Sequence, residues 1–235
     1  TPNENMDIDG MTWVSQGLVT SLPGHRQCRQ ELPLDLKSYL EKNRQPIIVN
    51  AVFPVKKGEN TIEIYENSGD TYGRLYALDY LKLQGKRRGA MLIPSGYYRH
   101  ELAAADHAKL KANGLACPAG FYHQINPHIP EEISSLVHLL FMLPQAQRPD
   151  SLYIGDDNFL PHAVTALKTI FGDRACEAVT ITSHANFPLL QQCDLPVKYF
   201  GLNVKEIIES SVRMIDRLRS GETVENQLIE VCDSP

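Results

Sequence analysis

The residues best placed to do chemistry in this sequence are polar side chains at the ends of predicted strands. Short apolar runs such as Ile47–Val49 and Leu152–Ile154 predict buried strands, and polar residues follow them closely. The carboxyl ends of parallel strands gather at one edge of a sheet, where small molecules bind. The pattern therefore predicts a ligand site built from strand-end side chains, namely Asn50, Ser95, Asp156, Asp157, His184 and Asn186.

Within this set, Asp156 and Asp157 form an adjacent pair of carboxylates. We expect Asp156 to accept hydrogen bonds from a ligand hydroxyl, with Asp157 beside it. The alternative is that this segment caps the following helix, a role that Asp157 or Asn158 would serve well. The sequence leaves both roles open.

The remaining candidates also have two interpretations. Asn50, His184 and Asn186 can each donate or accept a hydrogen bond to a ligand, and Ser95 can do the same. Polar residues at strand ends also satisfy the backbone of turns. Arg99 lies in the polar, aromatic segment 97–100, so it could either face the ligand or belong to an exposed loop.

Patterns for enzymes and metal sites are missing from this sequence. It contains no G-x-S-x-G, H-E-x-x-H or phosphate-loop motif. His123 and His128 flank Pro127 and share no helix face, and the five cysteines form no C-x-x-C pair. We therefore expect no catalytic residues, no cofactor and no metal, and we expect reduced cysteines.

The elements that position these residues alternate along the chain. Gly85, Gly114, Gly172 and Gly221 each follow a stretch with helical spacing, as is typical of helix ends. Strands are expected between the helices, at Ala90–Ile93, Ala116–Tyr122, Ser151–Ile154, Ala178–Thr182 and Val197–Leu202. This alternation predicts an α/β fold with doubly wound parallel sheets.

Composition limits the possible partners. The chain has 235 residues, 43% of them hydrophobic, and a formal net charge of −5. A net negative charge does not favour direct binding of this chain to nucleic-acid phosphates. No apolar stretch approaches the ~20 residues of a membrane helix, and no secretory signal is visible. We expect a cytoplasmic protein without a membrane partner.

Several segments taken in order resemble the lactose-repressor/galactose-repressor (LacI/GalR) family. Residues 9–14 resemble its "DGIIL" strand, and residues 45–50 resemble "IPVVLID". The most specific match is residues 73–93, which resemble "GRLA…HLLELGHRRIAFI". Residues 152–158 resemble the "VFAANDD" strand end, and residues 195–206 resemble the segment that returns the chain to the first subdomain. The resemblance covers essentially the whole chain.

The resemblance implies a periplasmic-binding-protein-like pair of α/β subdomains with a small-molecule effector in the cleft between them. By that analogy the first subdomain holds residues 1–66 and 203–221, and the second holds residues 67–202 and 222–235. The family's N-terminal helix-turn-helix and a further strand-helix-strand-helix portion are not in this sequence, so the resemblance implies a truncated first subdomain. It also implies a homodimer that reaches operator DNA only through that missing domain.

Two anchors that sugar-binding members of the family use are replaced here. Leu102 stands where many members have an arginine, and Ala185 or a neighbour stands where they have an aspartate. Because both anchors are replaced, the family's ligand class is not carried over to this chain. The effector is expected to be a small polar ligand, sugar-like or a related metabolite, that is less polar or more weakly bound than the ligands of typical members. Two other functions remain as alternatives: an extracytoplasmic solute-binding protein, and an α/β enzyme that uses Asp156, Asp157 and His184.

Overall fold

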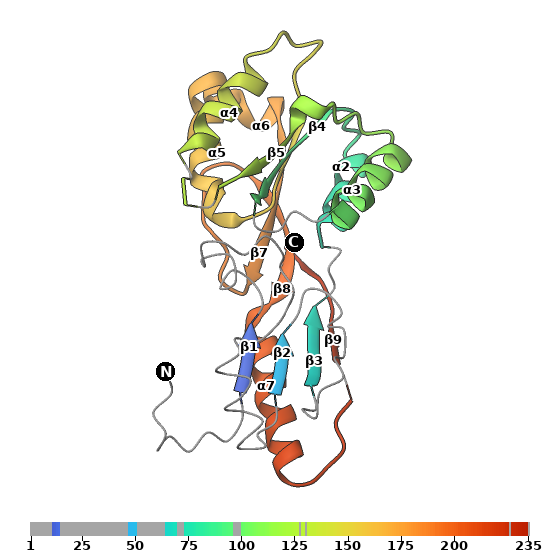
Figure 1. Cartoon of the computed structure of the whole chain (residues 1–235). Helices are drawn as coiled ribbons and strands as arrows, with labels where there is room; N and C mark the ends of the chain where they lie inside the picture. The colour runs from blue at the N-terminus through green and yellow to red at the C-terminus, as the bar shows by residue number, and fades with distance from the viewer. Residues whose placement is uncertain are drawn as a thin grey trace. The chain divides into compact units, whose positions relative to one another are not determined.

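The computed structural model describes residues 11–14, 47–50, 64–69, 73–95, 100–126, 128–129, 131–225 and 227–234. The chain divides into two compact units (Figure 1). One unit holds residues 1–71 and 202–230, and the other holds residues 72–201 and 231–235. The chain thus passes from one unit to the other after residues 71, 201 and 230.

The first unit contains a parallel four-stranded sheet in the order β1-β2-β3-β9. Met11 pairs with Ile47, and Ile47 pairs with Ile64. Helix α7 packs against β1, β2 and β3. The bounds in this unit are β1 (Met11–Val14), β2 (Ile47–Asn50), β3 (Ile64–Gly69), α7 (Val204–Arg219) and β9 (Gln227–Ile229).

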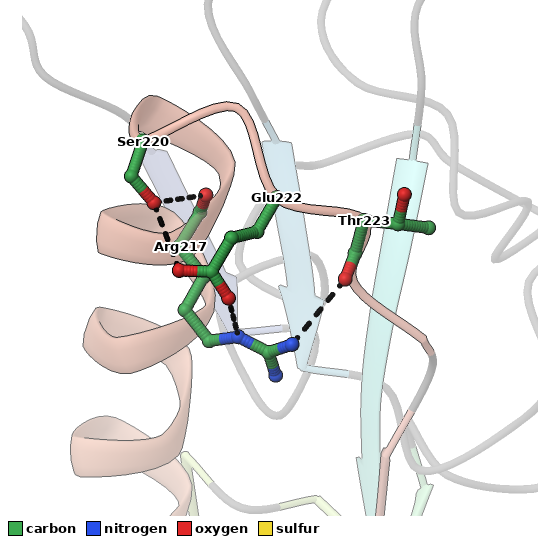
Figure 2. Close-up of polar contacts among 4 residues, drawn as sticks. All are labelled: Arg217, Ser220, Glu222 and Thr223. Atoms are coloured by element: carbon green, nitrogen blue, oxygen red, sulfur yellow. Dashed lines mark hydrogen bonds and ion pairs between the residues drawn. The ribbon is translucent and has the colours of Figure 1, made fainter.

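The ends of α7 follow from its sequence. The side chain of Asn203 accepts a hydrogen bond from the backbone N–H of Glu206 at 3.2 Å, as the N-x-x-E spacing of a capping box favours. At the other end, Gly221 has a φ of 81°, a conformation that favours glycine. Figure 2 shows how the turn is held, because Arg217 donates to a Glu222 carboxylate oxygen at 2.9 Å and to the Thr223 carbonyl at 3.3 Å.

The second unit is built on a six-stranded sheet in the order β10-β8-β7-β6-β4-β5. β4 pairs in parallel with β5 and with β6, and β6 pairs in parallel with β7. β10 is antiparallel to β8 and forms one edge. The strands are β4 (Gly89–Pro94), β5 (Tyr122–Ile125), β6 (Ser151–Ile154), β7 (Thr180–Phe187), β8 (Val197–Asn203) and β10 (Cys232–Asp233).

Helices cover both faces of this sheet. In Figure 1, α2 and α3 lie on one face and α4, α5 and α6 lie on the other. Neighbouring residues of β6 divide accordingly, since Tyr153 packs in the cluster of α2 while Leu152 and Ile154 pack with α4 and α5. The helices are α2 (Gly73–Leu83), α3 (His100–Asn113), α4 (Glu132–Phe141), α5 (Leu160–Phe171) and α6 (Ala175–Ala178), with short 3-10 turns at Ala119–Phe121, Asp157–Phe159 and Gly172–Arg174.

The predicted α/β class is confirmed, and the apolar runs of β4 and β6 are buried on both faces, as expected in a parallel sheet. Two strand boundaries were wrong. Residues 116–121 do not form a strand, because Phe121 donates to the Pro118 carbonyl in a 3-10 turn at 2.8 Å and β5 starts at Tyr122. The strand expected at Ala178–Thr182 instead runs from Thr180 to Phe187.

No helix among the residues that the structure describes combines the length and the apolar character that a membrane span requires.

Candidate functional site

The site begins where β6 leaves the sheet, at Gly155. Its backbone N–H donates to the carbonyl of Leu92 in β4 at 2.8 Å. A Cβ atom at this position would stand 2.9 Å from Cδ of Pro94 and 3.2 Å from the Leu92 carbonyl oxygen. A glycine is therefore needed for this close approach of the two strands, and it places Asp156 directly at the carboxyl edge.

Asp156 has extended backbone geometry and caps the 3-10 turn Asp157–Phe159. Its Oδ1 accepts hydrogen bonds from the backbone N–H of Asn158 at 3.0 Å and from the Asn158 side chain at 2.8 Å. Phe159 and Leu160, which follow, are fully buried and anchor the turn. The cap expected for the following helix was wrong, because Asp156 caps this 3-10 turn, whereas α5, which begins at Leu160, has Phe159 at its N-cap position and no side-chain cap.

One oxygen of Asp156 remains available despite this cap. Within the described part of the chain, the hydrogen bonds to Asp156 go to Oδ1, and Oδ2 accepts none from the protein. The carboxylate is half-buried and held by its cap. It can therefore present a fixed acceptor without a rearrangement of the turn.

His184 and Asn186 come from the last residues of β7. They were expected to follow the strand, but β7 continues to Phe187 and both lie within it. Ser183 pairs with Ile154 of β6, so His184 stands one residue beyond that pair, at the same edge as Asp156. Because alternate residues of a strand share a face, His184 and Asn186 lie on one side of the sheet.

The charges of these groups interact. Burial raises the pKa of Asp157, and the negative charge of Asp156 adds to this rise. The pKa of Asp157 is lowered in turn by His184 and by hydrogen bonds from the backbone of Asp157 and Asn186. Burial lowers the pKa of His184, while Asp157, Asp156 and a hydrogen bond with the Asn186 side chain oppose that decrease. The two carboxylates, the imidazole and the amide therefore form one cluster.

Two residues that sequence reasoning missed also lie at this cluster or at its edge of the sheet. Burial raises the pKa of Tyr199 of β8, Cys193 adds to this rise, and the charge of Asp157 adds a smaller part, so Tyr199 lies near Asp157. Its hydroxyl donates to the carbonyl of Gln191. Asn126 directly follows β5, at the same edge as the exposed Ser95 after β4. Asn126 is a polar residue at a strand end, but the strand was expected to end at Tyr122, so Asn126 was not recognised as a candidate. No local feature of the sequence marks Tyr199.

The structure does not place two of the expected site residues relative to this cluster. Asn50 is the last residue of β2, in the four-stranded unit, and the structure describes its backbone only. Arg99 lies outside the described residues. The cluster is thus formed by Asp156, Asp157, His184 and Asn186, with Ser95 at the same sheet edge.

This arrangement is suited to binding. Among the described residues, no group of three His, Cys, Asp or Glu side chains could hold a metal ion. The imidazole of His184 feels the charges of Asp157 and Asp156 and is hydrogen-bonded to the Asn186 side chain, but among the described residues no hydrogen bond joins it to a carboxylate that would orient it as a general base. The edge offers fixed acceptors and one amide, which together can recognise a polar ligand.

The fold matches those of solved transcription regulators. A regulatory protein of the LacI family from Chloroflexus aggregans superposes with a TM-score of 0.70 and 16% identity, over 96% of this chain and 75% of that one. A putative ribose operon repressor from Burkholderia thailandensis gives a TM-score of 0.62 and 19% identity, over 97% and 77%. The regulator CcpA of Lactococcus lactis gives 0.67 and 14%, also over 97% and 77%.

These similarities confirm the fold expected from the sequence resemblance. Their identities are low, so they show a shared fold and do not assign a ligand. No protein-family model matches the sequence, and no curated protein matches it either.

Proposed function

We propose that this chain is the effector-sensing part of a bacterial transcription regulator and is not an enzyme. It binds a small polar ligand, sugar-like or a related metabolite, at the carboxyl edge of the six-stranded sheet. The ligand is held by Asp156, Asp157, His184 and Asn186, with Ser95 at the same edge. Asn50 and Arg99 complete the proposed ligand set from other segments.

The observation that carries this proposal is the grouping of four polar side chains at the carboxyl edge of a parallel sheet, within a regulator fold. Open α/β sheets bind ligands at this edge. The structures matched over most of the chain are described as LacI-family regulators and repressors, and one from Escherichia coli is described as a sugar-binding regulator. Both observations favour a sensor.

The proposal includes how the signal is used. Ligand binding changes the equilibrium between two conformations of the protein, because the ligand binds one of them more tightly. In a cytoplasmic homodimer this change alters the affinity for operator DNA of a separate helix-turn-helix segment. The chain's net charge of −5 agrees with leaving DNA contact to that segment.

The two alternatives are less well supported. A solute-binding protein of a transporter could share the fold, but the matched structures described above are regulators. An enzyme using the two aspartates and His184 would need an imidazole paired with a carboxylate or a nucleophile. His184 is hydrogen-bonded to Asn186 instead.

The experiment that tests the proposed function starts with a thermal-shift screen of sugars, nucleosides and small acids. Calorimetric titration of the best compound then compares the parent with Asp156→Ala. Losing a hydrogen bond to a ligand costs about 1–3 kcal/mol, or roughly 5- to 150-fold in affinity. We expect Asp156→Ala to weaken binding by that factor.

Because Asp156 also caps a turn, a second variant separates the two roles. Asp156→Asn keeps a good capping residue and removes the charge. Glu177→Gln in α6 is the matched control, since α6 precedes β7 and so lies at the opposite, amino edge of the sheet. Unchanged affinity in both Asp156 variants would remove Asp156 from the site.

A further inference from the structure

The charge at the carboxyl edge of the six-stranded sheet is negative. Asp156 and Asp157 are adjacent, and both are half-buried. Burial is the largest cause of the raised pKa of Asp157, and the charge of the adjacent Asp156 adds to it. Additional negative charge would therefore be unfavourable at this position.

The groups that surround the two carboxylates do not neutralise them. His184 from β7 is held toward its neutral form by burial, which lowers its pKa. Asn186 from β7, Tyr199 from β8, and Ser95 and Asn126 after β4 and β5 are uncharged at neutral pH. Within the described part of this edge, no lysine or arginine faces the aspartates. Arg99, the one cation of the proposed ligand set, lies outside the described residues, and its single charge would offset only one of the two carboxylates.

A helix N-terminus favours anions, and α5 begins beside this edge. Asp156 caps the preceding 3-10 turn, whereas α5 itself has Phe159 at its N-cap position and no side-chain cap. The N-terminal end of a helix carries roughly half a positive charge, whereas each ionised carboxylate carries a full negative one. The net preference of the edge is therefore for positive charge.

We propose that the ligand of this site carries no negative charge, and that a protonated amine on the ligand is recognised by the paired carboxylates of Asp156 and Asp157. This inference rests on the proposed function and names the class of ligand: an amine-bearing polyol or sugar. The Oδ2 atom of Asp156 accepts no hydrogen bond from the described residues, and it accepts one from an N–H of the ligand amine. The amide of Asn186 remains for ligand hydroxyl groups.

The charge of the amine strengthens binding beyond what a hydroxyl provides. Hydrogen bonds between an ammonium group and a carboxylate are roughly twice as strong as those between neutral groups. We therefore expect an amino sugar to bind roughly tenfold more tightly than the matching neutral sugar at neutral pH. A phosphorylated form of the same sugar should bind more weakly than the neutral one, because its charge is repelled.

The test is a matched series of ligands measured by calorimetry on the full chain. Glucose, galactose and ribose are each titrated as the neutral sugar, an amino derivative and a phosphate ester. The expected order is amino derivative, then neutral sugar, then phosphate ester. Asp157→Asn should remove most of the advantage of the amine, whereas Glu177→Gln at the opposite edge of the sheet should leave it unchanged.

The outcomes separate this inference from the proposed function. If a phosphate ester binds as tightly as its neutral sugar or more tightly, the inference is wrong but the site still binds sugars. The same holds if the amino derivative gains nothing over the neutral sugar. If no member of the series binds the protein, the proposed sugar-sensing function is contradicted as well.

Discussion

Replacement of Gly201 by alanine is expected to lower the free energy of unfolding by about 3 kcal/mol or more, which is the upper range for overpacked cores. Gly201 lies in β8, between β7 and the edge strand β10. A Cβ atom at this position would stand 1.8 Å from the carbonyl oxygen of Ala185 and 2.8 Å from its carbonyl carbon. Both contacts are with backbone, so the strands themselves must separate.

Equilibrium urea unfolding followed by circular dichroism measures this loss. Gly120→Ala is the matched control, because its added Cβ would meet no atom within 4 Å. We expect the control to change stability by less than about 0.5 kcal/mol. Failure of Gly201→Ala to accumulate as folded protein would be the extreme form of the expected result, whereas stability equal to that of the control would refute the packing described here.

A second large effect is expected from Arg74→Met. Arg74 of α2 forms an ion pair with Asp106 of α3, and the two side chains are only 13% and 2% exposed. Tyr122 of β5 donates its hydroxyl to the other Asp106 oxygen at 3.0 Å. Removing one partner of a buried ion pair leaves an unpaired charge and costs roughly 3–5 kcal/mol. We expect Arg74→Met to lower the unfolding free energy by about that amount at neutral pH.

The pH dependence of this loss provides an independent check. Burial raises the pKa of Asp106, and Arg74 and Tyr122 oppose that rise, so the pKa should rise further in Arg74→Met. A carboxyl group whose pKa is higher in the folded state binds protons more readily there, so acid favours folding. The stability difference between variant and parent should therefore shrink as the pH falls toward the ordinary value of 3.8.

Two further variants separate the effect of an unpaired buried charge from the effect of losing an ion pair as such. Arg74→Met combined with Asp106→Leu removes both charges and should regain much of the lost stability. Lys168→Met breaks an ion pair with Asp194 that is largely exposed, and it should leave stability nearly unchanged. An Arg74→Met variant as stable as Lys168→Met at neutral pH would contradict a structural role for the buried pair.

The fold was predictable where buried segments leave a local pattern of apolar residues and helix-ending glycines in the sequence. The runs Ala90–Ile93 and Leu152–Ile154 are continuous and apolar because helices cover both faces of the sheet. The helix ends at Gly85, Gly114 and Gly221 were visible because each glycine has a positive φ. These signals are local, so no knowledge of the tertiary structure was needed.

The site was only partly predictable, because its geometry depends on pairing between distant strands. β7 extends to Phe187 through Ser183, His184 and Asn186, whose polarity suggested a loop. The role of Gly155 depends on Leu92 and Pro94, about sixty residues earlier in the chain. The nearness of Tyr199 to Asp157 depends on the placing of β8 and is equally non-local.

The site itself is tested most directly by hydrogen exchange with and without the best ligand from the screen. Amides in residues 155–159 and 185–190 follow or end β6 and β7 at the carboxyl edge, while residues 172–178 precede β7 at the opposite edge. A ligand at the carboxyl edge should slow exchange in the first two segments, because binding suppresses their local opening, and should leave the third unchanged. Slowed exchange in residues 172–178 with no change in residues 155–159 and 185–190 would contradict the proposed site.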